Sequence, residues 1–194
     1  VGRISSFTYD VMNRVLTQVN PLGQRTSFLY DDAGRPRVTI NPLGFRTTQV
    51  YDTRGRVAAV INPLGNRTSF AYDADNNRTA VINPLGQRTS TVYDSSNRPI
   101  ASISPTGYRT TTVYDALGRV SATINSAGGR TTVTYDANGR PVSTLSPLNQ
   151  RSTRVFDSAG RQVGSINPLS QRSTVVYNSA SRVTANINPL NQRS

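Results

Sequence analysis

The side chains that can act as acids, bases or metal ligands are few in kind and regular in spacing. His, Cys, Lys and Glu are absent, so the 22 basic residues are all Arg and the 10 acidic residues are all Asp. Apart from Asp32 and Asp75, every Asp occupies one position of a 21-residue repeat. Catalysis by paired carboxylates needs one asymmetric site, whereas a repeat supplies nearly equal copies. The sequence therefore predicts no enzyme, no catalytic residues and no cofactor.

One segment imitates a metal-binding loop. Asp73-Ala74-Asp75-Asn76-Asn77 matches the opening D-x-[DN]-x-[DN] of a calcium-binding loop. The bidentate Glu that such loops carry at their twelfth position is missing. We interpret the segment as a degenerate turn and predict no metal site.

The pair Tyr-Asp sets the period of the chain. A period this strict is typical of repeat architectures, in which small copies stack to share one core. Phe156-Asp157 and Tyr177-Asn178 continue the series in altered form. The unaltered pairs are Tyr9-Asp10, Tyr30-Asp31, Tyr51-Asp52, Tyr72-Asp73, Tyr93-Asp94, Tyr114-Asp115 and Tyr135-Asp136.

Two turn signals divide each copy into two short segments. The first is D-x-x-G, as in Asp52 to Gly55, and predicts a type I turn followed by a left-handed residue. The second is N-P-L-G, as in Asn62 to Gly65, where Pro presets the first corner and Gly the last. Because an apolar residue at a turn tip has no other explanation, we expect its Leu to point inward.

The segments between the turns are typical of β-strands. Val57, Ala59 and Ile61 alternate with other residues and are expected to share one half-buried face. Connections this short favour antiparallel neighbours. The predicted fold is all-β: a long coiled antiparallel β-ribbon of 21-residue hairpins with about eighteen strands. A parallel β-solenoid is the alternative.

Most Arg residues fall into two positions of the repeat. We expect the row five residues after the Tyr to pair with the Asp of its own or the next copy, completing a structural ladder of Tyr, Asp (with Asp157) and Arg. The first row comprises Arg14, Arg35, Arg56, Arg98, Arg119, Arg140, Arg161 and Arg182. The second comprises Arg25, Arg46, Arg67, Arg88, Arg109, Arg130, Arg151, Arg172 and Arg193. The copy beginning at Tyr72 has Asn77 in place of the first-row Arg.

The second Arg row has too few Asp partners, because the ladder holds only eight. Its members are expected to bond backbone carbonyls, stack on the Tyr rings or face water. If they face water, the row would bind polyanions such as acidic glycans in a salt-dependent way. The net charge of +12 raises nucleic acid as a partner. However, Arg residues that recur at fixed positions of a repeat are typical of a structural framework and not of a binding patch, so nucleic acid is not expected.

Domain organisation and location follow from the same pattern. We expect one continuous array of about nine copies over residues 1–194, starting and ending mid-repeat without caps, with Val1-Gly2 at the Leu-Gly positions. No apolar stretch approaches the ~20 residues of a membrane span. We interpret the chain as part of something longer that is exported to the cell surface or beyond.

The pattern Y-D-x-x-G-R, with its period and its I-N-P-x-G loop, resembles the Rhs or YD-repeat family over the whole chain. The resemblance implies a β-ribbon like the shells of Rhs and ABC-type toxins and the barrel of teneurins. Three hypotheses follow: a bacterial extracellular fibre, stalk or wall; an arc of a shell that encloses a toxin polypeptide; or an adhesive surface that binds polyanions. The expected partners are further copies of the repeat, in the same chain or end to end in a homopolymer.

Overall fold

The computed structural model describes residues 4–194 and contains only strands and turns. The turns follow from local chemistry. The fourth residue of both turn types has a positive φ, as at Gly55 (81°) and Gly65 (80°). Where Gly is replaced, Asn or Ser adopts the same conformation, as at Asn76 (69°) and Ser181 (58°). The predicted left-handed residue is confirmed. The positions of Val1 and Gly2 lie outside the described residues.

The eighteen strands come in two kinds that alternate along the chain. The odd-numbered strands, which run into the Tyr, are β1 (Ser6–Tyr9), β3 (Arg25–Tyr30), β5 (Arg46–Tyr51), β7 (Arg67–Tyr72), β9 (Arg88–Tyr93), β11 (Arg109–Tyr114), β13 (Arg130–Tyr135), β15 (Arg151–Phe156) and β17 (Arg172–Tyr177). The even-numbered strands are β2 (Val15–Val19), β4 (Pro36–Ile40), β6 (Val57–Ile61), β8 (Arg78–Ile82), β10 (Pro99–Ile103), β12 (Val120–Ile124), β14 (Pro141–Leu145), β16 (Gln162–Ile166) and β18 (Val183–Ile187).

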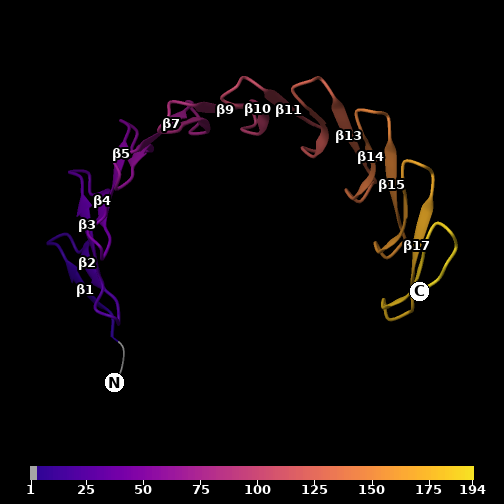
Figure 1. Ribbon diagram of the computed structural model, residues 1–194, viewed down its shortest axis with the longest axis horizontal. Coiled ribbons are helices and arrows are strands. Elements are labelled where there is room, and N and C mark those ends of the chain that lie inside the picture. The colour runs from indigo at the N-terminus through magenta and orange to yellow at the C-terminus, as the bar shows by residue number, and fades with distance from the viewer. Residues whose placement is uncertain (1–3) are drawn as a thin grey trace. The chain divides into compact units, whose positions relative to one another are not determined.

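The chain divides into two compact units. Unit 1 holds the residues up to Arg98 together with Ile103–Thr106, and unit 2 holds Pro99–Ser102 and Gly107–Ser194. Within unit 1 each strand from β1 to β9 pairs with the next, and within unit 2 each strand from β11 to β18 does so, always antiparallel. Figure 1 shows the strands of each unit following one another in chain order. The antiparallel hairpin repeat is confirmed, and these pairings do not fit the parallel solenoid. That the array runs unbroken from 1 to 194 stays a prediction.

The register gives each hairpin two different ends. Across the N-P-L-G turn, β6 and β7 pair regularly, from Ala59↔Ser69 to Ile61↔Arg67. Across the Tyr-Asp turn, β5 and β6 pair regularly up to Val50↔Ala59, and then the register shifts so that Tyr51 faces Val57. Such a bulge re-aims the side chain beside it and strengthens the local twist. One edge of each unit therefore carries every Tyr-Asp turn and the opposite edge every N-P-L-G turn.

The buried part of each unit is a row of small or β-branched residues at the centre of the even strands. Val38, Ala59, Ala80, Ala101, Ala122 and Ala185 are at most 3% exposed, with Thr17 at 8%. No large side chain of the described residues is fully buried. The core of each unit is therefore this central row, and not the larger Tyr, Ile, Val and Leu side chains. In β6, for example, Ala59, Val60 and Ile61 all have partners on both neighbouring strands, and Ala59 is the middle residue of the strand. Most Tyr, Ile and Val side chains around the central row are half-buried.

Candidate functional site: the two edges of the hairpin array

The Tyr-Asp edge is built on an Asp that organises its own turn. Asp52 Oδ1 accepts hydrogen bonds from the backbone N–H groups of Arg54 and Arg56, both at 2.9 Å. Its Oδ2 accepts the Arg56 Nε–H at 2.8 Å, in an ion pair whose side chains are only 21% (Arg56) and 23% (Asp52) exposed. The carboxylate thus bonds the turn backbone and the Arg together. The same ion pair joins Arg14 to Asp10, Arg35 to Asp31, Arg98 to Asp94, Arg119 to Asp115, Arg140 to Asp136 and Arg161 to Asp157.

These hydrogen bonds favour the charged form of each ladder Asp. The pKa of Asp52 is lowered, chiefly by the hydrogen bond from the Arg56 backbone N–H and then by the Arg56 side chain. The pKa of Asp31 is lowered chiefly by the Arg35 side chain. The pKa is lowered in the same direction at Asp10, Asp73, Asp94, Asp115, Asp136 and Asp157.

The first-row Arg also reaches the next copy. The Arg56 guanidinium lies 4.6 Å from the centre of the Tyr72 ring, the geometry of a cation–π contact. The Tyr72 hydroxyl in turn donates to the Val57 carbonyl at 2.9 Å, back in the copy of Arg56. The Arg contact recurs at Tyr30, Tyr51, Tyr135, Phe156 and Tyr177. The hydroxyl bond recurs at Tyr30, Tyr51, Tyr93, Tyr114, Tyr135 and Tyr177.

The fourth residue of a Tyr-Asp turn lies next to the first-row Arg of the preceding copy. A Cβ on Gly55 would lie 3.2 Å from Arg35 Nη1. Where this residue has a polar side chain, that side chain accepts instead: Arg56 Nη1 donates to Asn76 Oδ1 at 3.0 Å, and Arg161 Nη1 to Ser181 Oγ at 3.0 Å. Gly leaves room for the guanidinium, whereas Asn or Ser adds a bond between copies.

One copy lacks this arrangement. Asn77 replaces the Arg and donates to Asp73 Oδ2 at 3.0 Å and to Asn97 Oδ1 at 2.7 Å. The neighbouring Arg78 lies over Phe70, 5.5 Å from the ring centre. Asn77 therefore links two copies by a neutral hydrogen bond instead of a stacked cation.

The N-P-L-G edge uses the same turn with a neutral first residue. Asn62 Oδ1 accepts the backbone N–H groups of Leu64 at 3.0 Å and Asn66 at 2.9 Å. Leu64 itself is 83% exposed. The expectation that the turn Leu points inward is wrong, because the Asn side chain and the left-handed residue complete the turn without it. Leu22, Leu43, Leu85, Leu148, Leu169 and Leu190 are also exposed.

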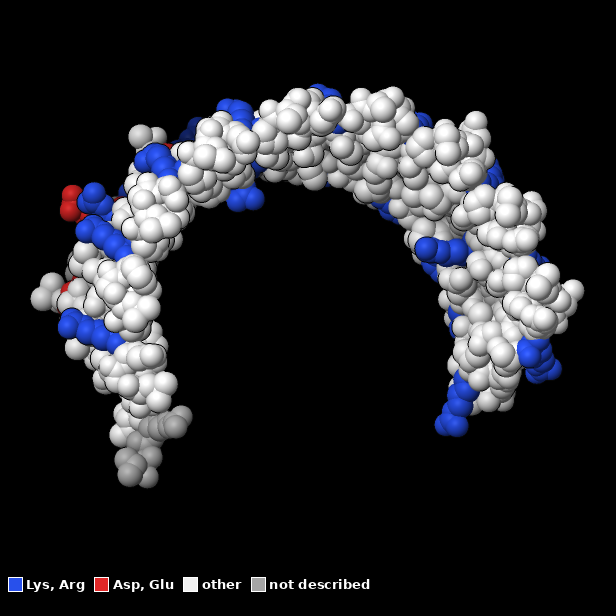
Figure 2. All heavy atoms as spheres, in the orientation of Figure 1, with Lys and Arg blue, Asp and Glu red and all other residues white. Residues whose placement is uncertain are grey.

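The second Arg row lies at this same edge, on the first residue of each odd strand. All nine members are exposed. Their contacts are local: Nε donates to Ser69 from Arg67 at 3.2 Å, to Ser90 from Arg88 at 3.0 Å and to Thr111 from Arg109 at 3.4 Å. On the face shown in Figure 2, Arg side chains project at intervals along both units, while acidic atoms are visible only over unit 1.

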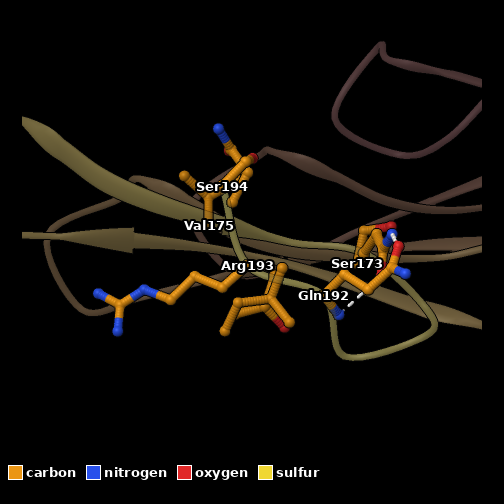
Figure 3. A pocket seen from close by; sticks show the side chains of 9 residues that line it. Ser173, Val175, Gln192, Arg193 and Ser194 are labelled. Atoms are coloured by element: carbon orange, nitrogen blue, oxygen red, sulfur yellow. Dashed lines mark hydrogen bonds between the residues drawn. The ribbon is translucent and has the colours of Figure 1, made fainter.

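The hollows of the surface offer little for catalysis. A shallow one of about 340 Å³ lies beside β17 and β18, where Figure 3 shows the Arg193 side chain extending away from Ser173 and Gln192. Another, of about 360 Å³, lies between Arg37 and Thr48. Neither holds two carboxylates. Among residues 4–194 no three acidic side chains gather to bind a metal, and Asp75 N–H simply donates to Asp73 Oδ1 at 3.0 Å.

Sequence reasoning missed the contacts between copies. It treated stacking on Tyr as an option for the second Arg row, whereas in the structure first-row residues such as Arg56 both pair with Asp and stack on the next aromatic ring. Arg182, whose turn begins with Asn178, donates its backbone N–H to Asn178 Oδ1 at 2.9 Å. Sequence reasoning also missed the Tyr hydroxyl bonds. The signal was the fixed spacing from a first-row Arg to the aromatic residue at the Tyr position of the next copy, as from Arg140 to Phe156.

Comparisons with known proteins agree with this geometry. The Teneurin YD-shell family model matches residues 2–157. The solved structure of TcdB2-TccC3 is similar over 96% of this chain and 11% of that chain, with a TM-score of 0.69 and 14% identity. The structure of TcdB2-TccC3 without its hypervariable C-terminal region is similar over 97% of this chain and 11% of that chain, with a TM-score of 0.71 and 15% identity. At such identities the likeness concerns the fold, and the chain spans about a tenth of the solved chains. None of the curated proteins matches.

Proposed function

Because this chain belongs to the Teneurin YD-shell family, we propose that it builds a structural β-wall in an assembly outside the cell. The family and the fold are those of structural repeats. The mechanism is mechanical: backbone hydrogen bonds run from strand to strand, and the Tyr-Asp edge locks each copy to the next.

One observation carries this proposal, namely the recurrence of the same bonds between copies. In unit 1, Arg56 stacks on Tyr72 while Tyr72 bonds back to Val57. In unit 2, Arg119 stacks on Tyr135 while Tyr135 bonds back to Val120. A site for chemistry would need one copy to differ from the others in a reactive group. Here the reactive groups are already used in equivalent bonds, which supports a structural ladder and no catalytic role.

The wall has two possible forms, an open fibre or stalk and an arc of a closed shell around a polypeptide. Electron microscopy of the purified chain separates them. Filaments of indefinite length would support a homopolymer joined end to end. Discrete closed particles would support the shell and rule out the fibre. Separate globules without ordered ribbons would overturn both.

The extracellular location is also part of the proposal. The described residues include no helix with the length and hydrophobicity to cross a membrane. An antibody against the chain should label intact producing cells or their medium. Labelling that appears only after the cells are lysed would contradict the location.

A second candidate function rests on the exposed Arg row. Arg25, Arg46, Arg67 and Arg88 stand at an edge of unit 1 that has no acidic residue, which favours binding of acidic glycans. Binding of this kind weakens as salt rises. Heparin affinity measured in 50 mM and 500 mM salt tests it, and equal affinities would contradict it.

A further inference from the structure

The charge of the described residues is divided unequally between the two edges. At the Tyr-Asp edge the eight ladder Asp residues balance the eight first-row Arg residues, and Asp32 and Asp75 are balanced by Arg54 and Arg78. At the N-P-L-G edge the nine second-row Arg residues have no Asp beside them, because every Asp of the sequence belongs to a Tyr-Asp turn. The excess of positive charge therefore lies at one edge in each unit.

That cationic edge also carries a row of exposed Leu side chains. The exposed fractions are 78% for Leu43 and 83% for Leu64 in unit 1, and 78% for Leu148 and 77% for Leu169 in unit 2. Single exposed apolar residues are ordinary, but an exposed Leu repeated at the same position along one edge indicates an interaction site. Successive Leu residues in a unit are two strands apart, about 10 Å along the edge.

The turn holds each Leu rigidly in this exposed place. Asn41 Oδ1 accepts the Leu43 N–H at 3.0 Å and the Phe45 N–H at 2.9 Å, and Pro42 fixes the backbone before the Leu. Asn167 holds Leu169 in the same way, at 3.0 Å. A Leu presented on a rigid turn loses little conformational entropy when it is buried by a partner.

The order of the groups along each turn points to the kind of partner. The Leu stands at the tip of the turn, whereas the Arg is the first residue of the strand that follows, as in Leu64 and Arg67. An apolar side chain at the turn tip, followed three residues later by a cation at the start of the strand, matches a lipid surface, where acyl chains lie below a layer of phosphates. A soluble polyanion would use the Arg and leave the Leu in water.

We propose that the N-P-L-G edge docks on an anionic lipid surface, with its Leu side chains inserted at the boundary of headgroups and acyl chains and its Arg side chains on the phosphates. Guanidinium groups bind phosphate oxygens bidentately. This function is additional to the wall and requires the Leu row, which the glycan candidate does not.

Vesicle sedimentation of the whole chain tests the proposal. We expect binding to vesicles of phosphatidylcholine with phosphatidylglycerol in low salt, and at least about tenfold weaker binding to phosphatidylcholine alone. Replacing the seven exposed turn Leu residues by Ser should weaken binding to the anionic vesicles about tenfold or more. Heparin binding by this variant should stay within about twofold, since heparin has no apolar layer.

Two control variants fix the interpretation. Val11→Ser with Met12→Ser removes exposed apolar side chains from the opposite edge and should leave vesicle binding unchanged. Replacing the nine second-row Arg residues by Gln should abolish binding to both vesicles and heparin. If the Leu variant binds anionic vesicles like the parent, the Arg row serves a soluble polyanion and the lipid proposal is overturned. Failure of the parent chain to bind anionic vesicles also overturns it, without affecting the wall.

A fluorescence measurement tests insertion directly. Leu64→Trp should be quenched by lipids brominated on their acyl chains, and Met12→Trp on the opposite edge should not. Equal quenching at the two positions, or none at Leu64→Trp, would contradict an inserted edge. Because Leu64 is 83% exposed and packs little, the substitution should not disturb folding, which circular dichroism checks.

Discussion

The two edges of each unit share one turn geometry but make different contacts. At both, a side-chain oxygen of the first residue accepts two backbone N–H groups, as Asp52 and Asn62 show, and the fourth residue is left-handed. They differ in the residue that follows. At the Tyr-Asp edge Arg56 pairs with Asp52 and stacks on the next copy, whereas at the N-P-L-G edge Asn66 occupies the same place. A turn therefore needs only a side-chain oxygen at its first residue and a left-handed fourth residue. Bonding one copy to the next needs, in addition, an ion pair and an aromatic ring.

Acid should weaken one edge and spare the other, and we expect this to be the largest effect. The pKa of each ladder Asp is lower in the folded chain than its usual value near 4, so the unfolded chain binds more protons. The stability that these Asp residues contribute is complete above pH of about 4 and is lost as the pH falls through their folded pKa. Amide hydrogen exchange should show Arg56 N–H losing protection in acid before Asn66 N–H. Equal loss at the two amides would contradict the comparison.

Removing one Arg from each edge should give unequal losses. Arg56→Ala removes the bonds to Asp52 and the contact with Tyr72, and should lower the local free energy of unfolding by about 2 kcal/mol. Arg67→Ala should change it by less than about 0.5 kcal/mol, because Arg67 is exposed and its Nε–H donates to the nearby Ser69 hydroxyl. Urea denaturation combined with hydrogen exchange at the Tyr72 amide measures both. Similar losses would mean that the first row does not lock the copies.

The Tyr hydroxyl can be tested by removal and by addition. Tyr72→Phe deletes the bond to the Val57 carbonyl and should cost about 1 kcal/mol of unfolding free energy. Phe156→Tyr should stabilise by a comparable amount, because Arg140 already lies 4.6 Å from the Phe156 ring and the equivalent carbonyl belongs to Pro141. Thermal unfolding of the two variants checks this. Destabilisation by Phe156→Tyr would show that the hydroxyl lacks an acceptor there.

The smallest expected gain comes from restoring the altered copy. Asn77→Arg should pair with Asp73 and stack on Tyr93, raising the unfolding free energy by about 0.5–1 kcal/mol. The matched control is Gln87→Arg on the opposite edge, which adds the same charge without an Asp or an aromatic partner. Urea denaturation should show a gain for the first variant alone. A gain for both would indicate a general effect of charge.

The strands, turns and family were predictable because they depend on local patterns. Alternating residues such as Val57, Ala59 and Ile61 indicate a strand, and Asp or Asn with Gly three residues later indicates each turn. The match to the Teneurin YD-shell model confirms the resemblance seen in the Y-D-x-x-G-R pattern. These signals survive in altered copies, where Asn76 and Ser181 replace Gly without changing the backbone.

The direction of side chains was less predictable. The pattern does not show that Ala59 is fully buried while Ile61 is only half-buried, because the two lie on the same face of β6 and both have partner strands on either side. Nor does it place Leu64 in water, since hydrophobicity alone suggests burial. The Arg56 contact with Tyr72 joins residues in different hairpins, and the Tyr72 ring stands beside the bulge between Ala71 and Tyr72, which the sequence does not reveal.

The bond from Tyr72 to Val57 spans 15 residues, as does that from Tyr135 to Val120. Each copy therefore bonds to its neighbour at a fixed separation along the chain, whichever copy that neighbour is. Deleting or duplicating a whole copy rejoins each Tyr hydroxyl to an equivalent carbonyl, whereas inserting or deleting one residue within a strand would shift its register and turn its side chains to the opposite face. Unequal recombination within the gene can thus alter the length of such a protein in steps of one copy while each junction stays bonded.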